Sequence, residues 1–151
     1  MGKPHSHALR LGRWSTPGSI YLVTFTTDQR KPVFHTWFDA SCVARALASP
    51  ATWPQAQLLC WVLMPDHWHG LIELGDEPLS RAVARAKAVA SRDWRRGCGS
   101  TARLWAHGFH DHALRKEENQ LHVARYIIAN PLRAGLVKRV GDYPYWDAVW
   151  L

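Results

Sequence analysis

Two histidines separated by one residue are the first candidates for chemistry in this sequence. His67 and His69 flank Trp68 in the segment HWHGLIEL. On a β-strand, alternate side chains share one face and lie about 6.5–7 Å apart along the backbone. The two imidazoles can therefore converge on one metal ion while Trp68 anchors the opposite face, and Glu73 falls on the histidine face as an auxiliary group. The alternative is a pair of half-buried structural histidines beside a turn.

Two other His-x-His spacings rank lower as metal sites. His110 and His112 flank Asp111, which would have to face the core if both histidines faced a site. His5 and His7 fall in a polar, basic N-terminal stretch, where we expect them to be inert. The pair at His67 and His69 is therefore the preferred candidate.

A tyrosine on a predicted helix is the second candidate. Residues 116–129 have the periodicity of an amphipathic helix. On its polar side, His122, Tyr126 and Asn130 stand at i, i+4 and i+8 and so line one stripe. Tyr126 can present its phenol to a site, with the Asn130 amide oxygen one turn away and His122 as an auxiliary base. A half-buried core tyrosine is the alternative.

A stripe made only of arginines is the third feature, on the helix predicted at 79–96. At about 100° per residue, these arginines fall on one side of the helix and the apolar residues on the other. A stripe without an acidic partner favours contact with an anion such as a DNA phosphate, although a solvated helix face is the alternative. Its members are Arg81, Arg85, Arg92, Arg95 and Arg96.

Composition points to the same class of partner. The chain has 151 residues, 47% of them hydrophobic, which suffices for one domain with a core. Its formal net charge of +7 favours nucleic acid over a membrane surface. No apolar run approaches the roughly 18 residues of a membrane span. Three scattered cysteines argue against a disulfide framework, and the polar N-terminus is not a signal peptide, so we expect a protein of the reducing cytoplasm.

The remaining pattern supplies the elements that must position these residues. Hydrophobic periodicity and turn signals predict strands at 19–27, 57–64, 67–74 and 108–113, and helices at 36–47, 79–96, 116–129 and 131–137. Two strand–helix–strand passes around a central hairpin predict an α+β ferredoxin-like sandwich, an antiparallel sheet with helices packed on it. We expect residues 1–18 to be a basic tail and 19–151 to be one catalytic domain. The aromatic stretch after residue 140 is predicted to be packed but irregular.

Two segments carry a resemblance to a known family. WVLMPDHWHGLIEL followed by ARYIIANPLRAGLV is similar to the REP-associated tyrosine transposases, which belong to the HUH single-tyrosine transposases of bacterial insertion sequences. YLVTFTTDQRKPVF and LWAHGFHDHALR match in the same order, so the resemblance covers residues 19–140. The C-terminal YPYW departs from the family pattern, because Asp147 follows where a Trp-Ser pair is common.

The resemblance implies a role for each matching residue. His67 and His69 would be metal ligands, Asn130 the polar third ligand and Tyr126 the nucleophile. A divalent ion, Mg²⁺ or Mn²⁺, would polarise the scissile DNA phosphate. The product would be a 5′-phosphotyrosine and a 3′-hydroxyl, an intermediate from which the strand can be rejoined.

The resemblance also implies a partner, which is single-stranded or REP-like hairpin DNA in a bacterial cytoplasm, at the nucleoid. The arginine stripe and the basic N-terminus would contact its backbone. We expect a monomer, as in REP-associated relatives, with a dimer as in insertion-sequence transposases as the alternative. Two further classes stay open. A catalytically inactive hairpin-binding protein would need neither the metal pair nor the tyrosine, and a small zinc hydrolase would leave Tyr126 incidental.

Overall fold

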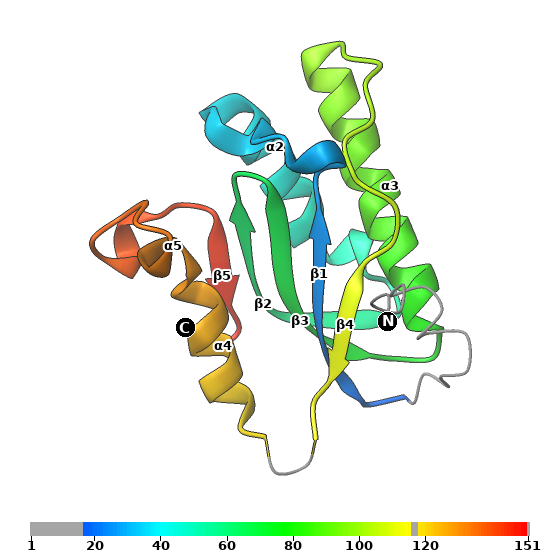
Figure 1. Ribbon diagram of the computed structural model, residues 1–151. Helices are drawn as coiled ribbons and strands as arrows, with labels where there is room; N and C mark the ends of the chain where they lie inside the picture. Colours follow the sequence, from blue (N-terminus) through cyan, green and yellow to red (C-terminus); the bar gives the residue numbers. More distant parts are fainter. Residues whose placement is uncertain (1–16, 116–117, 151) are drawn as a thin grey trace, which may run out of the picture.

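The structure, a computed structural model, describes residues 17–115 and 118–150. Its centre is a five-stranded antiparallel sheet in the order β4-β1-β3-β2-β5 (Figure 1). The strands are β1 Ile20–Thr26, β2 Ala56–Met64, β3 His67–Leu74, β4 His110–Ala113 and β5 Trp146–Ala148. The first four strands have the order of a ferredoxin-like sandwich, so the predicted fold class is confirmed.

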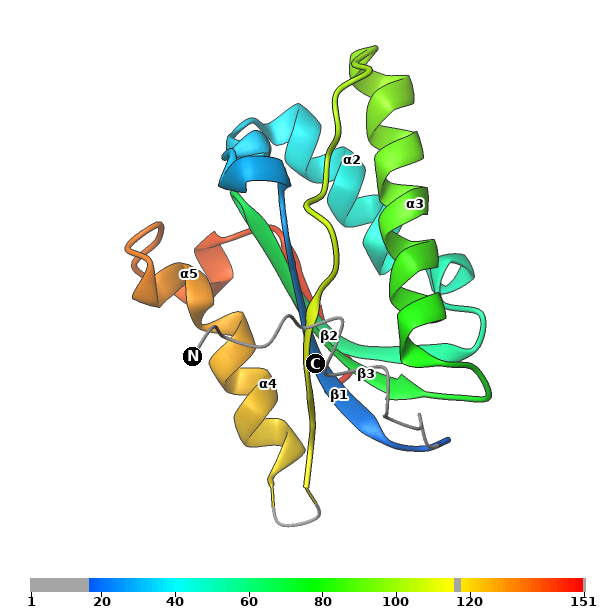
Figure 2. The same cartoon turned by 45° about the vertical axis from the view of Figure 1, so that its right-hand side comes forward.

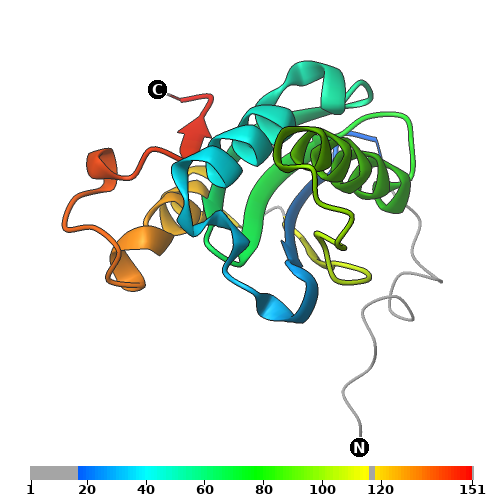
Figure 3. The ribbon, with the colours of Figure 1, turned by 90° about the horizontal axis from the view of Figure 1, so that it is seen from above.

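Helices cover both faces of this sheet. The helices α2 Trp37–Ala48 and α3 Leu79–Cys98 pack against each other over one face, and α4 Gln120–Ile128 and α5 Asn130–Arg133 lie over the other (Figures 2 and 3). Single-turn 3-10 helices fill the connections: η1 Asp28–Arg30, η2 Val33–His35, η3 Pro50–Thr52 and η4 Val140–Asp142. None of the helices in the described part of the chain is both long and apolar enough to cross a bilayer.

Aromatic side chains build the core beneath α2 and α3. Along β1 every second residue is buried on this face, and Phe25 stacks on Trp68 with ring centroids 4.8 Å apart. Trp68 is fully buried and also stacks on Trp53. This burial confirms the prediction that Trp68 anchors the strand on the face opposite the histidines. It also determines which face of β3 the flanking residues occupy.

A smaller core lies on the opposite face, beneath α4. Val62, Met64 and Leu71 of the β2–β3 hairpin pack there against Ala124 and Ile127 of α4. His67 and His69 share this face, because they alternate with Trp68 along β3. The helix that carries Tyr126 thus covers the sheet face that carries the histidine pair.

Two predicted helices have different bounds in the structure. The helix predicted from residue 116 begins at Gln120, because the Asn119 side chain accepts a hydrogen bond from the His122 amide and caps it. The helix predicted at 131–137 is the single turn α5, which ends before Gly135 with its φ of 74°. Residues 116 and 117, and positions 1–16 of the predicted tail with His5 and His7, lie outside the described residues.

The C-terminal stretch also contains a strand that its sequence did not indicate. Residues of β5 pair with β2, Trp146 opposite Val62 and Ala148 opposite Cys60. Three residues are too few to show a period of two. The strand is defined only by its pairing with the edge of β2.

Candidate functional site

The two histidines meet at the beginning of β3. Their ring centroids are 4.5 Å apart and the ring planes cross at 80°. The tight Pro65–Asp66 turn between β2 and β3 places His67 opposite Met64, so the pair sits at one end of the hairpin. Both rings are partly buried. The strand spacing therefore does bring two imidazoles together on one face, as predicted.

Each ring is oriented by a hydrogen bond through its Nδ1 atom. His67 Nδ1 lies 2.6 Å from an Asp66 carboxylate oxygen, and His69 Nδ1 lies 2.7 Å from the Thr24 hydroxyl oxygen. In the tautomer in which both Nδ1–H groups donate, the lone pair of each ring is on Nε2. Metal-binding histidines are held in this way by an oxygen on the other ring nitrogen, so the donor set fits a metal ion at the two Nε2 atoms.

The environment of His69 keeps its imidazole neutral. Burial is the main cause that lowers the pKa of His69, to about 4, and nearby His67, Arg133 and Arg30 lower it further while Asp66 opposes them. A neutral imidazole has a lone pair to offer to a metal. The neutral form of His69, which can bind a metal ion, is therefore favoured at neutral pH.

A strained loop brings a cation to the same turn. Gln29 and Arg30 in η1 both have left-handed φ angles, 55° and 54°, which are unfavourable for residues with a side chain. Arg30 Nε reaches Asp66 at 3.2 Å, on the carboxylate that holds His67. Buried Thr27 fixes the loop by donating to the Lys31 and Asp66 carbonyls. Arg30 was not among the predicted site residues, because its contact with Asp66 joins two segments that are distant in the sequence.

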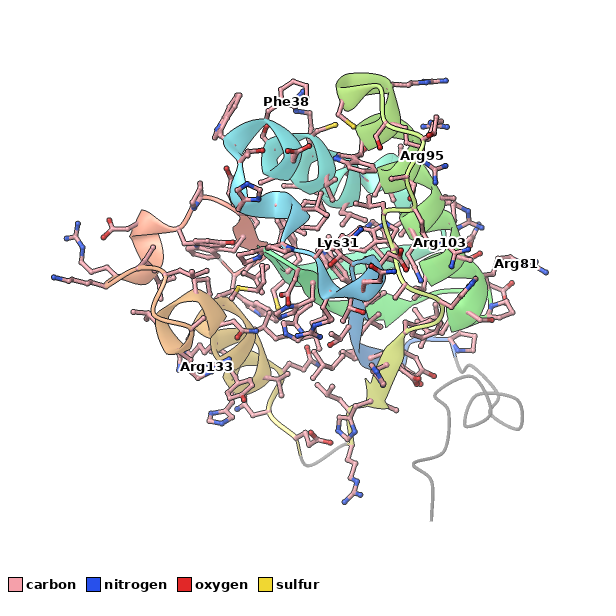
Figure 4. The ribbon with its side chains drawn as sticks, turned by 45° about the horizontal axis from the view of Figure 1, so that its top comes forward. Lys31, Phe38, Arg81, Arg95, Arg103 and Arg133 are labelled. Atoms are coloured by element: carbon pink, nitrogen blue, oxygen red, sulfur yellow. The ribbon has the colours of Figure 1, made fainter. Side chains whose placement is uncertain are left out.

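Tyr126 on α4 is 61% exposed, so it is not the half-buried core residue considered as the alternative. The guanidinium carbon of Arg133 stands 3.7 Å from the centre of its ring. Figure 4 shows Arg133 beside the α4–α5 corner. Arg133 therefore touches the tyrosine and acts electrostatically on His69. It falls within the YIIANPLRAGLV segment that carries the family resemblance, but its role needed the structure.

A third ligand beside the two histidines would have to be a side chain of another type. Within 17–115 and 118–150, no group of three or more histidine, cysteine, aspartate or glutamate side chains could hold a metal ion. Asn130, half-buried at the first position of α5, carries an amide oxygen and follows Tyr126 by one turn. The role of Asn130 as the third ligand stays a prediction.

The remaining candidates lie at different distances from this centre. His122 is exposed on α4, one turn before Tyr126. Glu73 is near the other end of β3, opposite Ile20 and Gln57, about 13 Å along the strand from His69. His112 is on the edge strand β4, where its Nε2 lies 3.0 Å from Glu118.

The arginine stripe follows α3, on the opposite face of the sheet from Tyr126. Figure 4 shows Arg81 and Arg95 along this helix, away from Arg133. Arg92 and Arg96 line a groove between α2 and α3 together with Arg45. Arg45 was not predicted, since it lies on a different helix.

The prediction that the stripe lacks acidic partners is wrong for two members. Arg85 forms two hydrogen bonds of 2.8 and 2.7 Å with Glu77, and Arg92 lies 3.4 Å from Asp93. Glu77 precedes the helix, so a helical projection of α3 alone omits it. Arg95 donates to the Ala102 carbonyl. Arg81 and Arg96 are exposed at the two ends of the helix and remain the clearest candidates for phosphate contacts.

Comparisons with known proteins agree on one family. The model of a family described as "Transposase IS200 like" matches residues 15–130. The REP-associated tyrosine transposase of Escherichia coli (strain K12) is 31% identical over 91 residues, which cover 59% of this chain and 52% of that protein. A Haemophilus influenzae protein with a provisional form of the same name is 23% identical over 142 residues, 86% of this chain and 80% of that protein. The chain therefore spans about half the length of the E. coli relative.

A solved structure gives the corresponding result for the fold. It is described as a REP-associated tyrosine transposase bound to a REP hairpin, and it matches with a TM-score of 0.69 at 21% identity. The match covers 97% of this chain and 82% of that chain. The shared fold therefore extends over almost the whole of this chain.

Proposed function

Since this chain belongs to the IS200-like transposase family, we propose that it cleaves and rejoins DNA strands through a covalent bond to Tyr126. The family match confirms the resemblance to this family. One arrangement carries the proposal. The histidine pair, with both Nδ1 atoms engaged, occupies the sheet face covered by the helix of Tyr126.

The proposed chemistry is a transfer of a DNA phosphoryl group to the phenol and back. The Tyr126 oxygen attacks the phosphorus, its proton leaves to solvent, and the bond from phosphorus to the 3′ oxygen breaks. The departing oxygen takes up a proton, which gives a 3′-hydroxyl and a 5′-phosphotyrosine. Because one phosphodiester is exchanged for another, a 3′-hydroxyl can reverse the reaction and reseal a strand.

His67, His69 and Asn130 would hold the metal ion of this reaction. A bound Mg²⁺ or Mn²⁺ would polarise the scissile phosphate and offset its developing charge, and the two imidazoles favour Mn²⁺ by ligand type. Asp66 and Thr24 keep the ligand nitrogens in position. The burial of His69 keeps a proton from competing for its lone pair at neutral pH.

The proposed substrate is hairpin DNA with a single-stranded flank. The matching solved structure is described as bound to a REP hairpin, and the net charge of +7 here favours a polyanionic partner. The exposed arginines of α3 would hold backbone phosphates, which position DNA without reading its sequence.

The test is incubation with labelled hairpin and single-stranded DNA from beside its own gene, with Mn²⁺. We expect a covalent protein–DNA adduct on a denaturing gel, mapped by mass spectrometry to Tyr126. Tyr126→Phe should bind the DNA but form no adduct, because only the nucleophilic hydroxyl is lost. Tyr145→Phe is the matched control and should form the adduct.

Three outcomes would contradict parts of the proposal. An adduct formed by Tyr126→Phe would move the nucleophile elsewhere. Hairpin binding by the wild type without any adduct would leave a DNA-binding protein only. Full cleavage in excess chelator would remove the metal from the mechanism.

A further inference from the structure

Tyr126 needs a restraint that its own helix does not supply. A side chain that is 61% exposed on α4 has little packing to hold its ring in one orientation. Misplacement of a reacting group by about 1 Å can slow a reaction by about 100-fold. The one ring contact described for Tyr126 is with Arg133, whose guanidinium carbon stands 3.7 Å from the ring centroid.

We propose that Arg133 is the positioning residue for this tyrosine, holding its ring by stacking while the edge of its guanidinium binds the phosphate under attack. This inference rests on the function proposed above. The α4–α5 corner provides the geometry. The new helix starts at Asn130, and Arg133, one turn later, is turned back over Tyr126.

The chemistry of arginine suits both parts of this role. A guanidinium is planar, so it can lie flat on an aromatic ring while its five N–H donors point outward in the plane. Those donors match two oxygens of one phosphate. Arg133 also acts electrostatically on His69, so one positive charge influences both the tyrosine ring and the histidine pair. A lysine would supply charge but neither the flat face nor the fork.

The experiment compares Arg133→Lys with Arg125→Lys, because Arg125 is an exposed arginine beside Tyr126 in sequence and has no described ring contact. Both variants keep the net charge. We expect Arg133→Lys to bind the hairpin like the wild type, within about twofold, but to form the Tyr126 adduct about 10- to 100-fold more slowly. Arg125→Lys should form it at the wild-type rate.

A second measurement detects the contact without activity. Protons on the Arg133 side chain above an aromatic ring should resonate upfield in NMR spectra, and Tyr126→Leu should return them to ordinary shifts. A wild-type adduct rate in Arg133→Lys would overturn the proposal and leave the function intact. Ordinary Arg133 shifts in the wild type would also overturn it. Absence of any adduct with the wild type would overturn both the function and this role.

Discussion

At the residue scale, the orientation of the histidine rings depends on neighbours that the His-x-His spacing does not include. Thr24 of β1 lies directly opposite His69 in the β1–β3 ladder, so the sheet register itself places its hydroxyl on His69 Nδ1. Asp66 reaches His67 from the turn just before the strand. The two rings are thus held by two different elements, and each partner can be tested separately.

Replacing Thr24 with valine should weaken the metal site without removing a ligand. Valine keeps the shape but cannot accept the Nδ1 hydrogen bond, so His69 loses its orientation. We expect Mn²⁺ affinity to fall about 10- to 100-fold, measured by titration calorimetry after metal removal with chelator. Thr26→Val is the control, because Thr26 lies on the same strand face opposite His67. Equal affinity in both variants would show that packing alone orients His69.

At the element scale, β3 depends on a close contact between two of its own residues. The Trp68 indole covers Gly70, and a Cβ at Gly70 would stand 2.0 Å from the indole ring. The glycine therefore lets the largest core side chain lie flat between Phe25 and Trp53. This packing also determines that His67 and His69 face α4.

Gly70→Ala should therefore destabilise the fold. The added methyl group forces the indole out of its stack, at a cost of about 1–3 kcal/mol of unfolding free energy. Urea denaturation followed by circular dichroism measures the change. Gly141→Ala is the matched control, since nothing lies within 4 Å of a Cβ at that position. Unchanged stability in Gly70→Ala would mean that the core can repack around the methyl group.

The arginines of α3 should divide into two kinds. Arg81 and Arg96 are exposed, and changing both to glutamine should lower the log–log salt slope of hairpin binding by about 0.7–0.9 for each lost phosphate contact. Arg85→Gln should instead lower the unfolding temperature, because the Glu77 side chain, only 6% exposed, loses its partner. Fluorescence anisotropy at several salt concentrations and thermal unfolding separate the two effects. An unchanged slope in the double variant would remove α3 from the DNA surface.

At the scale of the whole molecule, the C-terminal segment completes the face that carries the site. The Tyr143 hydroxyl donates a hydrogen bond to the Leu63 carbonyl of β2. The strand β5 pairs with β2 and forms the edge of the sheet. Tyr143 packs in the same small core as Ala124 and Ile127 of α4. The helix of the proposed nucleophile is thus supported by residues from the far end of the chain.

Tyr143→Phe should cost about 1 kcal/mol at pH 7, the usual value of a lost hydrogen bond. Burial raises the pKa of Tyr143 above its ordinary value of 10.0. Its contribution to stability is therefore complete below about pH 10 and is lost as the pH rises further, because the unfolded state ionises first. Urea midpoints measured between pH 8 and 11 should decline less steeply in the variant.

Part of that decline should persist in Tyr143→Phe. Cys60 lies in the same core, and burial raises the pKa of its thiol from 9.0 to about 12. The stability that the protonated Cys60 thiol contributes to the fold begins to fall above pH 9 in both proteins. An identical alkaline decline in wild type and variant would show that Tyr143 does not contribute to it.

Local patterns determined much of this protein. The apolar run of β2, the alternation in β3 and the amphipathic α3 are visible within ten to twenty residues, because periods of two and 3.6 repeat along the chain. The same short spacing placed His67 and His69 on one face, and Tyr126 one turn from Asn130. The order of these elements was enough to predict the ferredoxin-like sandwich.

Only the tertiary structure decided which residues meet across those elements. Thr24 reaches His69 through strand register, Glu77 reaches Arg85 across a helix start, and Arg133 folds back on Tyr126 because a new helix begins between them. β5 is too short to show a repeating sequence pattern, and it forms by pairing with the edge of β2. Such contacts depend on register, layer and corner geometry. Each is a property of two segments together, so neither segment shows it alone.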